Sequence, residues 1–449
     1  MLTHSASQKV IDQVNTARAL FSGNNKRPLP AGQVTVQSNG HLTLAASGGR
    51  QYGLRPNGTL ASFKDSQGTR ATYGSNGQLR SVQTKDSKII FGRAGGRIVI
   101  KQLPNHMTAV SFDRHSGYIQ STIVRGNSKS VQRTYIVHGQ TFVRSYAPYS
   151  YRSLELVVYK PSIIYAPTFY GWLYYPWESP ATYTWDWAND PWYTAYESYF
   201  APLPAYSSAT LWMTDFILGS TLAAAYEQQQ DFPATQEDGG AAPVEAEAQD
   251  TPSESETYAQ NPGPITPQLR AAFAEQVREE TAEENAVATN QASPDVQQLP
   301  SNLERNHLFL VADILYVSSD QGNCWLNGGD LIGVVDPSGS SSDTALMSVL
   351  SSKRGDCPVG ASADVRLEDL QEMDNNLRLH MDNAIAQLHS NQGQGGLPAA
   401  PHSAIAPPPR SAMDDVPGVP NAATILADAE QSSSDEKDKV IREAFSQGN

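Results

Sequence analysis

The segment FYGWLYYPWESPATYTWDWANDPW (Phe169–Trp192) is the centre of the most aromatic stretch of the chain, residues 146–206. This stretch holds 13 Tyr, 5 Trp and 2 Phe, which is 20 of the 39 aromatic residues in the sequence. Each aromatic ring can bury about 150–250 Å², so no other segment offers as much apolar area to a core. Eight prolines divide the stretch into short pieces, which excludes a long helix and a regular sheet. The sequence therefore predicts an irregular aromatic region against which the flanking elements pack.

A repeat precedes this region, in residues 34–160. Turns recur in it at intervals of 18 to 19 residues, followed by a looser fifth: Ser38-Asn39-Gly40, Pro56-Asn57-Gly58, Ser75-Asn76-Gly77, Ala94-Gly95-Gly96 and His115-Ser116-Gly117. Apolar residues alternate after each turn, as Leu42 and Leu44 do after the first. Asn-Gly between alternating strands favours a hairpin, because both central residues of the tight turn need positive φ. The repeat therefore predicts a long antiparallel meander.

Part of this repeat resembles the YD (Rhs-type) repeat, whose pattern is Tyr-Asp-x-x-Gly-Arg-Leu. The matching residues are Tyr73, Gly77 and Leu79, with a second partial match at Phe112-Asp113 and Gly117. Gly74 and Gln78 stand where the family has Asp and Arg. The resemblance covers about residues 34–125 and implies β-structure of the kind found in secreted and surface proteins. It implies no catalytic residue.

The charges are divided unevenly along the chain. Residues 1–160 carry 21 Lys and Arg against 5 Asp and Glu, a net +16, although the whole chain has a net charge of −14. Such a basic block can hold an anionic partner, namely a polysaccharide, lipid headgroups or nucleic acid. The alternative is that it faces the chain's own acidic half. Nucleic acid ranks last among the partners because the Lys and Arg are spread singly.

Composition and periodicity divide the chain into segments. They are an N-terminal helix and linker (1–33), the basic hairpin repeat (34–160), the aromatic region with a helix (161–230), an acidic disordered linker (231–264), a helix (265–290), a linker (291–302), a small β domain with an amphipathic helix (303–390) and a disordered tail (391–449). The glutamate-rich face of the helix at 265–290 favours a solvated spacer or an assembly helix. Within the tail, a frayed helix is expected near Glu436–Phe445. The expected fold is mainly β with peripheral helices (α+β).

The segment 303–390 combines short strands with one strongly amphipathic helix. Apolar runs between turns predict a small β-barrel-like domain, and apolar residues then follow at helical spacing: Leu370, Met373, Leu377, Met381, Ile385 and Leu388. Cys324 and Cys357, the two cysteines of the chain, lie in the β unit. A disulfide would stabilise a domain too small for a large core, whereas two buried thiols are the alternative. Export favours the disulfide and a cytoplasmic location favours the thiols.

Candidate sites are few. The sequence has no metal-ligand spacing, nucleophile elbow or phosphate loop, so it predicts no catalytic, cofactor-binding or metal-binding residue. Flat faces for ligand stacking are offered by the tryptophans of the aromatic region: Trp172, Trp177, Trp185, Trp187 and Trp192. Glu178, Asp186 and Asp190 lie among them, as carboxylates do in a sugar-binding groove. The alternative is that Asp186 and Asp190 cap turns.

The function expected from these features is non-enzymatic. Residues 1–26 are polar without the apolar core of a signal peptide, and no run reaches the roughly 18 apolar residues of a membrane span. Export stays open beside a cytoplasmic location, because a start codon placed too far downstream would remove a signal peptide. The Tyr/Trp-rich segment 165–226 is similar to uncharacterised bacterial envelope proteins. We therefore expect a structural or adhesive protein of the bacterial envelope that contacts polysaccharide or other envelope components. The alternative is carbohydrate binding, or less readily processing, by the Tyr/Trp-rich region.

Overall fold

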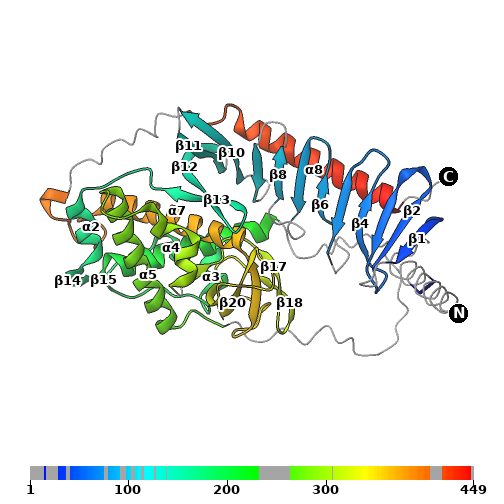
Figure 1. Ribbon diagram of the computed structural model, residues 1–449. Helices are drawn as coiled ribbons and strands as arrows, with labels where there is room; N and C mark the ends of the chain where they lie inside the picture. Colours follow the sequence, from blue (N-terminus) through cyan, green and yellow to red (C-terminus); the bar gives the residue numbers. More distant parts are fainter. Residues whose placement is uncertain are drawn as a thin grey trace.

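The computed structural model describes residues 15–16, 29–36, 41–74, 79–91, 98–102, 107–112, 116–125, 128–137, 139–231, 263–305, 307–404 and 417–445. The fold is mainly β with peripheral helices, as expected. A long sheet extends from a body built of helices and a second sheet (Figure 1). The expected N-terminal helix and the acidic linker lie almost entirely outside the described residues.

The hairpin repeat forms one antiparallel sheet of 13 strands that follow one another in chain order. The strands are β1 (Gly32–Val36), β2 (Leu42–Ala46), β3 (Gln51–Leu54), β4 (Leu60–Lys64), β5 (Arg70–Tyr73), β6 (Leu79–Gln83), β7 (Ser87–Phe91), β8 (Ile98–Gln102), β9 (Thr108–Ser111), β10 (Ser116–Arg125), β11 (Ser128–Val137), β12 (Gln140–Tyr151) and β13 (Leu154–Lys160). Gly58 in the β3–β4 turn has a φ of 81°, as its Asn-Gly turn predicts. The predicted meander is therefore confirmed.

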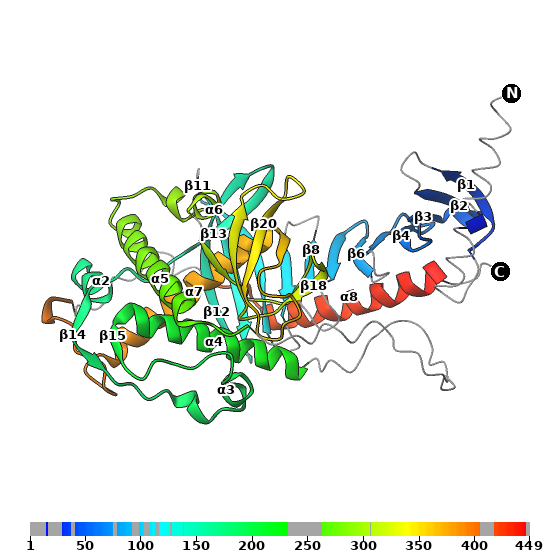
Figure 2. The same cartoon turned by 90° about the horizontal axis from the view of Figure 1, so that it is seen from below.

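Helix α8 (Ala422–Phe445) lies along one face of this sheet (Figures 1 and 2). Its buried residues Leu426 and Ala429 pack on the strands from β7 to β11, and Val440 and Ala444 pack on the strands from β2 to β6. The expectation of a disordered tail is thus wrong for these residues, and the frayed helix expected at 436–445 is the last part of α8. An isolated helix of this composition would be marginal in water, and burial on the sheet supplies its stability.

Gly117 was expected in a turn but lies inside β10. A Cβ at this position would come within 2.7 Å of Leu426 Cδ2 and 2.4 Å of the Val110 carbonyl oxygen. The glycine is therefore required mainly by the close approach of the neighbouring strand β9, and the Leu426 side chain of α8 also lies over it.

The body contains the helices α2 (Pro167–Tyr174), α3 (Pro191–Tyr196), α4 (Ala209–Asp231), α5 (Pro267–Ala288), α6 (Leu299–Glu304) and α7 (Leu367–Asn391). It also contains the 3-10 helices η2 (Asp186–Asn189), η3 (Pro294–Gln297) and η4 (His402–Ala404), whereas η1 (Ser47–Gly49) lies between β2 and β3 of the long sheet. A short two-stranded sheet joins β14 (Pro176–Ala181) to β15 (Tyr206–Ser208). The Thr266 hydroxyl caps α5 by accepting the Leu269 N–H at 3.2 Å, as its Thr-Pro start predicts. Of the described helices, none combines the length and apolarity that crossing a membrane requires.

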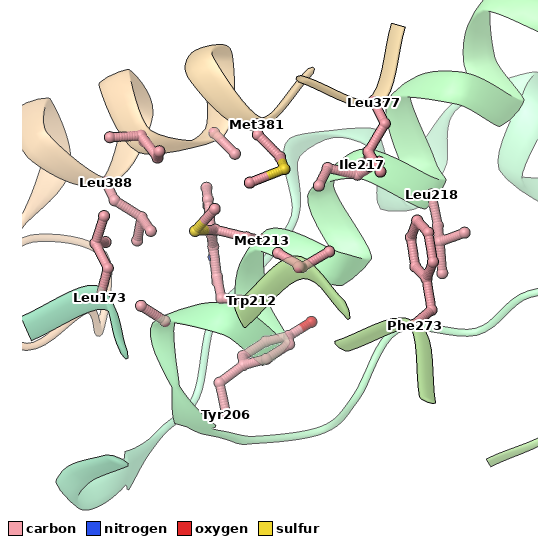
Figure 3. Packing of buried hydrophobic residues seen from close by; sticks show 14 of the residues in the cluster. Leu173, Tyr206, Trp212, Met213, Ile217, Leu218, Phe273, Leu377, Met381 and Leu388 are labelled. Carbon is pink, nitrogen blue, oxygen red and sulfur yellow. The ribbon is translucent and has the colours of Figure 1, made fainter. Parts of the chain in front are cut away.

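The aromatic region is the core of the body. Figure 3 shows Trp212 and Met213 of α4 facing Met381 and Leu388 of α7, with Tyr206 farther from α7. The predicted apolar stripe of α7 is buried along its whole length, from Leu370 to Leu388. Residues 391–404, expected in the disordered tail, also join this core through Leu397, Ala400 and Ala404. The aromatic region thus holds α4, α5 and α7 together. Packing by its flanking elements was expected, whereas the inclusion of α5 and α7 is a finding of the structure.

The small β domain is a six-stranded antiparallel sheet with β16 and β18 at its edges. Its strands are β16 (Leu308–Leu310), β17 (Leu315–Ser319), β18 (Gly322–Leu326), β19 (Leu331–Asp336), β20 (Thr344–Ser351) and β21 (Ser362–Arg366). Cys324 and Cys357 form a disulfide in its core, which is one of the two alternatives that the sequence left open.

Two expectations about the connecting segments are wrong. Residues 291–302 are not a linker, because η3 and α6 lie there and Leu299 is fully buried. The glutamate-rich face of α5 is not fully solvated, because Glu280 and Glu284 are each 2% exposed, while Glu275 and Glu279 are exposed. Glu280 lies 3.2 Å from the guanidinium of Arg378 on α7, and this buried ion pair makes α5 part of the body.

Candidate functional site

The register of the meander arranges its side chains into continuous rows. Residues that pair across antiparallel strands share a face of the sheet, and successive residues in a strand alternate between faces. One row is apolar and lies under α8; it consists of Val34, Leu44, Tyr52, Phe63, Ala71, Val82, Ile89, Ile100, Ala109 and Ile119. In each strand, the residues directly before and after the apolar-row residue point to the opposite face of the sheet. We call this face, which lies opposite α8, the open face.

The first row of the open face gathers six of the Lys and Arg residues of the repeat, and we call it the basic row. It consists of Gln33, Ala45, Gln51, Lys64, Arg70, Gln83, Lys88, Lys101, Thr108, Gln120, Arg133 and Arg144. No Asp or Glu belongs to it. Residues that are scattered singly along the sequence are thus gathered on neighbouring strands, about 4.8 Å apart.

The cations of the basic row on β4 to β8 are accessible to a partner to different degrees. Arg70 and Lys88 are exposed, and Lys64 and Lys101 are half-buried. None of these cations forms an ion pair with a residue in the described part of the chain. The alternative that the basic block faces the chain's own acids therefore does not account for Lys64, Arg70 and Lys88, whereas Lys101 lines the same cleft as Glu368 and Glu372.

The second row of the open face begins with small polar residues. Its members are Thr35, Thr43, Gly53, Ser62, Thr72 and Ser81, which we call the hydroxyl row, and then Ile90, Val99, Val110 and Tyr118. The hydroxyls of Thr72 and Ser81 are hydrogen-bonded at 2.7 Å. A Cβ on Gly53 would meet the Ser62 hydroxyl at 2.4 Å, so glycine leaves room for that hydroxyl.

Both rows lead into a cleft of about 240 Å³ between the sheet and the body. Val99, Lys101 and Gln120 line it on the sheet side, and Leu315, Glu368 and Glu372 line it on the side of the body. Near this junction the Arg80 guanidinium lies 4.9 Å from the ring centre of Tyr316 on β17. The open face therefore ends in a cleft where the small β domain approaches the sheet.

Arg133 on β11 is the member of the basic row that lines the cleft and binds the body. Its guanidinium lies 4.4 Å from the ring centre of Tyr118 and 4.2 Å from that of Tyr146, and it donates to both carboxylate oxygens of Glu372 at 2.7 Å. Burial opposes the charge of Arg133, but Glu372 and the tyrosines outweigh it and raise its pKa well above the ordinary value. Arg133 is thus committed to the junction, and the cations free for a ligand are those on β4 to β8.

The five tryptophans expected to stack on a ligand mostly stack on one another. Trp177, Trp185 and Trp192 are buried, whereas Trp172 and Trp187 are half-buried. Trp172 stacks on Trp177 with ring centres 5.7 Å apart, and Trp187 stacks on Trp185 at 5.1 Å. Ligand stacking in this region stays a prediction for the partly exposed rings of Trp172 and Trp187.

The carboxylates expected beside these rings are exposed at Glu178, Asp186 and Asp190. Asp186 lies in the first turn of η2, and Asp190 is the residue that precedes α3 at its N-cap. Asp190 thus occupies the N-cap position that the capping alternative expects, although its side chain makes no capping hydrogen bond, and the N-cap of η2 is Trp185 instead of Asp186. Within the described residues, no three His, Cys, Asp or Glu side chains are placed to hold a metal ion.

The sequence carries a signal for the basic row that simple alternation does not reveal. Register shifts occur between Gly53 and Leu54 on β3 and between Thr72 and Tyr73 on β5. The extra residues are Ala61 on β4 and Arg80 on β6, and they keep Leu60 and Leu79 on the α8 side while the basic row stays in register. The short motif Arg70-Ala71-Thr72 contributes one residue to each row: Arg70 to the basic row, Ala71 to the apolar row and Thr72 to the hydroxyl row.

No protein-family model, curated protein or solved structure matches this chain. The function is therefore inferred from the rows and the cleft themselves.

Proposed function

We propose that this chain is a non-enzymatic binding protein of the cell envelope that holds a linear polyanion along the basic row. The observation that carries the proposal is the register that places Lys64, Arg70, Lys88 and Lys101 on one face, with no carboxylate in the row. Single surface charges bind weakly, but a row of them on a rigid sheet meets a repeating anion at several points. A structural or adhesive role follows from a binding face of this length.

The proposed location rests on the disulfide. The bond between Cys324 and Cys357 fits a protein that matures in an oxidising compartment, since cytoplasmic thiols are usually kept reduced. Export also gives the basic row access to the acidic polymers of a cell surface.

Retention on immobilised heparin, used as a general polyanion, tests the proposal. The variant Lys64→Gln/Arg70→Gln/Lys88→Gln removes three charges from the basic row. The matched variant Lys160→Gln/Lys437→Gln/Arg442→Gln removes three exposed or half-buried charges that lie off the open face. We expect the wild type and the matched variant to elute at similar salt, and the row variant to elute at clearly lower salt.

Equal elution of the two variants would contradict the proposal, because the total charge alone would then set the retention. So would a wild-type protein that passes through heparin at low salt. Melting temperatures of both variants near that of the wild type show that the fold is intact.

Ligand stacking on Trp172 and Trp187 is a separate proposal for the same protein. A change of tryptophan fluorescence on addition of neutral oligosaccharides, lost in Trp187→Leu, would support it. A spectrum unchanged by every oligosaccharide tested would remove it.

A further inference from the structure

We infer that the polyanion is an acidic polysaccharide, a chain of uronate-type sugars that lies across the strands with its carboxylates on the basic row and its hydroxyls on the hydroxyl row. This inference rests on the proposed function and adds the chemical class of the ligand. Two rows of different chemistry run side by side over the same strands, and a polyuronate presents two kinds of group at the same repeat.

The hydroxyl row is shaped for hydrogen bonding at its surface. Ser62 and Thr72 are exposed, and Thr72 is bonded to Ser81 across the strands. Each hydroxyl both donates and accepts, which matches the hydroxyl groups of a sugar. Gly53 leaves the surface of the sheet beside Ser62 free of a side chain, because a side chain there would displace the Ser62 hydroxyl.

The same face is poorly suited to nucleic acid. Sheet proteins that bind single strands stack the bases on aromatic side chains. From β1 to β8 neither row of the open face has an aromatic residue. A DNA major groove admits a helix or a two-stranded ribbon, and a broad sheet does not enter it.

The row also sets a minimum length for the ligand. Lys64 on β4 and Lys101 on β8 are separated by four gaps between neighbouring strands, which is about 19 Å at about 4.8 Å per gap. Each sugar ring of an extended 1,4-linked chain lengthens the chain by a distance comparable to one gap between neighbouring strands. Oligomers of about four or more rings should therefore bind much better than dimers.

Calorimetry with the full chain tests the inference with polygalacturonate oligomers of two to eight rings. Methyl-esterified oligomers keep the same sugars without the charge, and oligothymidylate of equal charge is the second polyanion. The hydroxyl variant Ser62→Ala/Thr72→Val/Ser81→Ala is compared with the row variant Lys64→Gln/Arg70→Gln/Lys88→Gln. We expect binding of the charged oligomers from about four rings upward, a loss of about tenfold or more in the row variant, and a loss of about threefold to tenfold in the hydroxyl variant.

The outcomes separate the two proposals. Tighter binding of oligothymidylate than of polygalacturonate at the same salt would overturn the inference and leave polyanion binding standing. An unchanged affinity of the hydroxyl variant for polygalacturonate would also overturn it. If neither polymer binds, the inference and the proposed function fail together.

Discussion

Arg133 of the meander and Glu372 of α7 form a bidentate ion pair across the junction of the sheet and the body, with both N–O distances at 2.7 Å. Arg133 is 2% exposed, so it depends on this partner for its charge. We expect Glu372→Gln to lower the free energy of unfolding by about 3–5 kcal/mol, because it leaves a buried guanidinium unpaired. Urea denaturation of the full chain measures the loss.

A matched control for this prediction is Glu368→Gln, one turn earlier on α7 in the same cleft. It should change the free energy of unfolding by less than about 1 kcal/mol, as a partly exposed charge does. The double variant Arg133→Met/Glu372→Leu should recover much of the loss, since it removes both charges. Equal effects of the two glutamine variants would contradict the role of the ion pair.

The contact of α8 with the sheet predicts that the same substitution at two neighbouring positions of α8 changes the melting temperature by different amounts. Leu426 is buried over Gly117, whereas Ala427 is exposed. We expect Leu426→Asp to detach the start of α8 and lower the melting temperature, because an unpaired carboxylate would be buried on the apolar row. Ala427→Asp adds the same charge to solvent and should leave the melting temperature nearly unchanged. Hydrogen exchange that is equally slow in α8 of both variants would be the contrary result.

The disulfide predicts a local stability difference. It closes a loop with a sequence separation of 33, for which the chain-entropy relation gives about 3–4 kcal/mol. Cys324→Ala/Cys357→Ala should therefore lower the melting temperature of the small β domain, while retention on heparin stays as in the wild type. Intact mass with an alkylating agent, before and after reduction, shows whether the bond is present in protein from its native cell fraction. Two thiols alkylated without reduction would argue against the oxidised form and against the proposed envelope location.

His380 predicts one part of the pH dependence. Burial lowers the pKa of His380 in the folded chain to about 4, below the value of about 6.5 expected when unfolded. Its contribution to stability is therefore fully present above pH 6.5 and is lost as the pH falls through 4. We expect His380→Gln to lose less stability between pH 6.5 and 4 than the wild type. The variant His402→Gln, at an exposed position, should follow the wild-type curve, and a His380→Gln curve parallel to both would refute the prediction.

The sequence by itself determined the local elements. The Asn-Gly turns predict the hairpins, the Thr266-Pro267 start predicts α5, and the stripe from Leu370 to Leu388 predicts α7, because each signal acts within a few residues. The sequence left a disulfide and two buried thiols as alternatives for Cys324 and Cys357. Only the fold of the small β domain brings the two cysteines close enough to form the bond.

The tertiary structure decided the candidate site and the course of the C-terminal segment. Lys64, Arg70 and Lys88 belong to one row only because strand register and two irregularities between strands align them. Such alignment depends on backbone pairing across the sheet and is not written in the spacing of charges. Helix α8 likewise forms against the apolar row, since its small residues Ala429 and Ser433 give it little apolar surface of its own. Local propensity thus fixed the parts of this protein, whereas pairing between distant strands and burial between distant segments fixed the surface that they present.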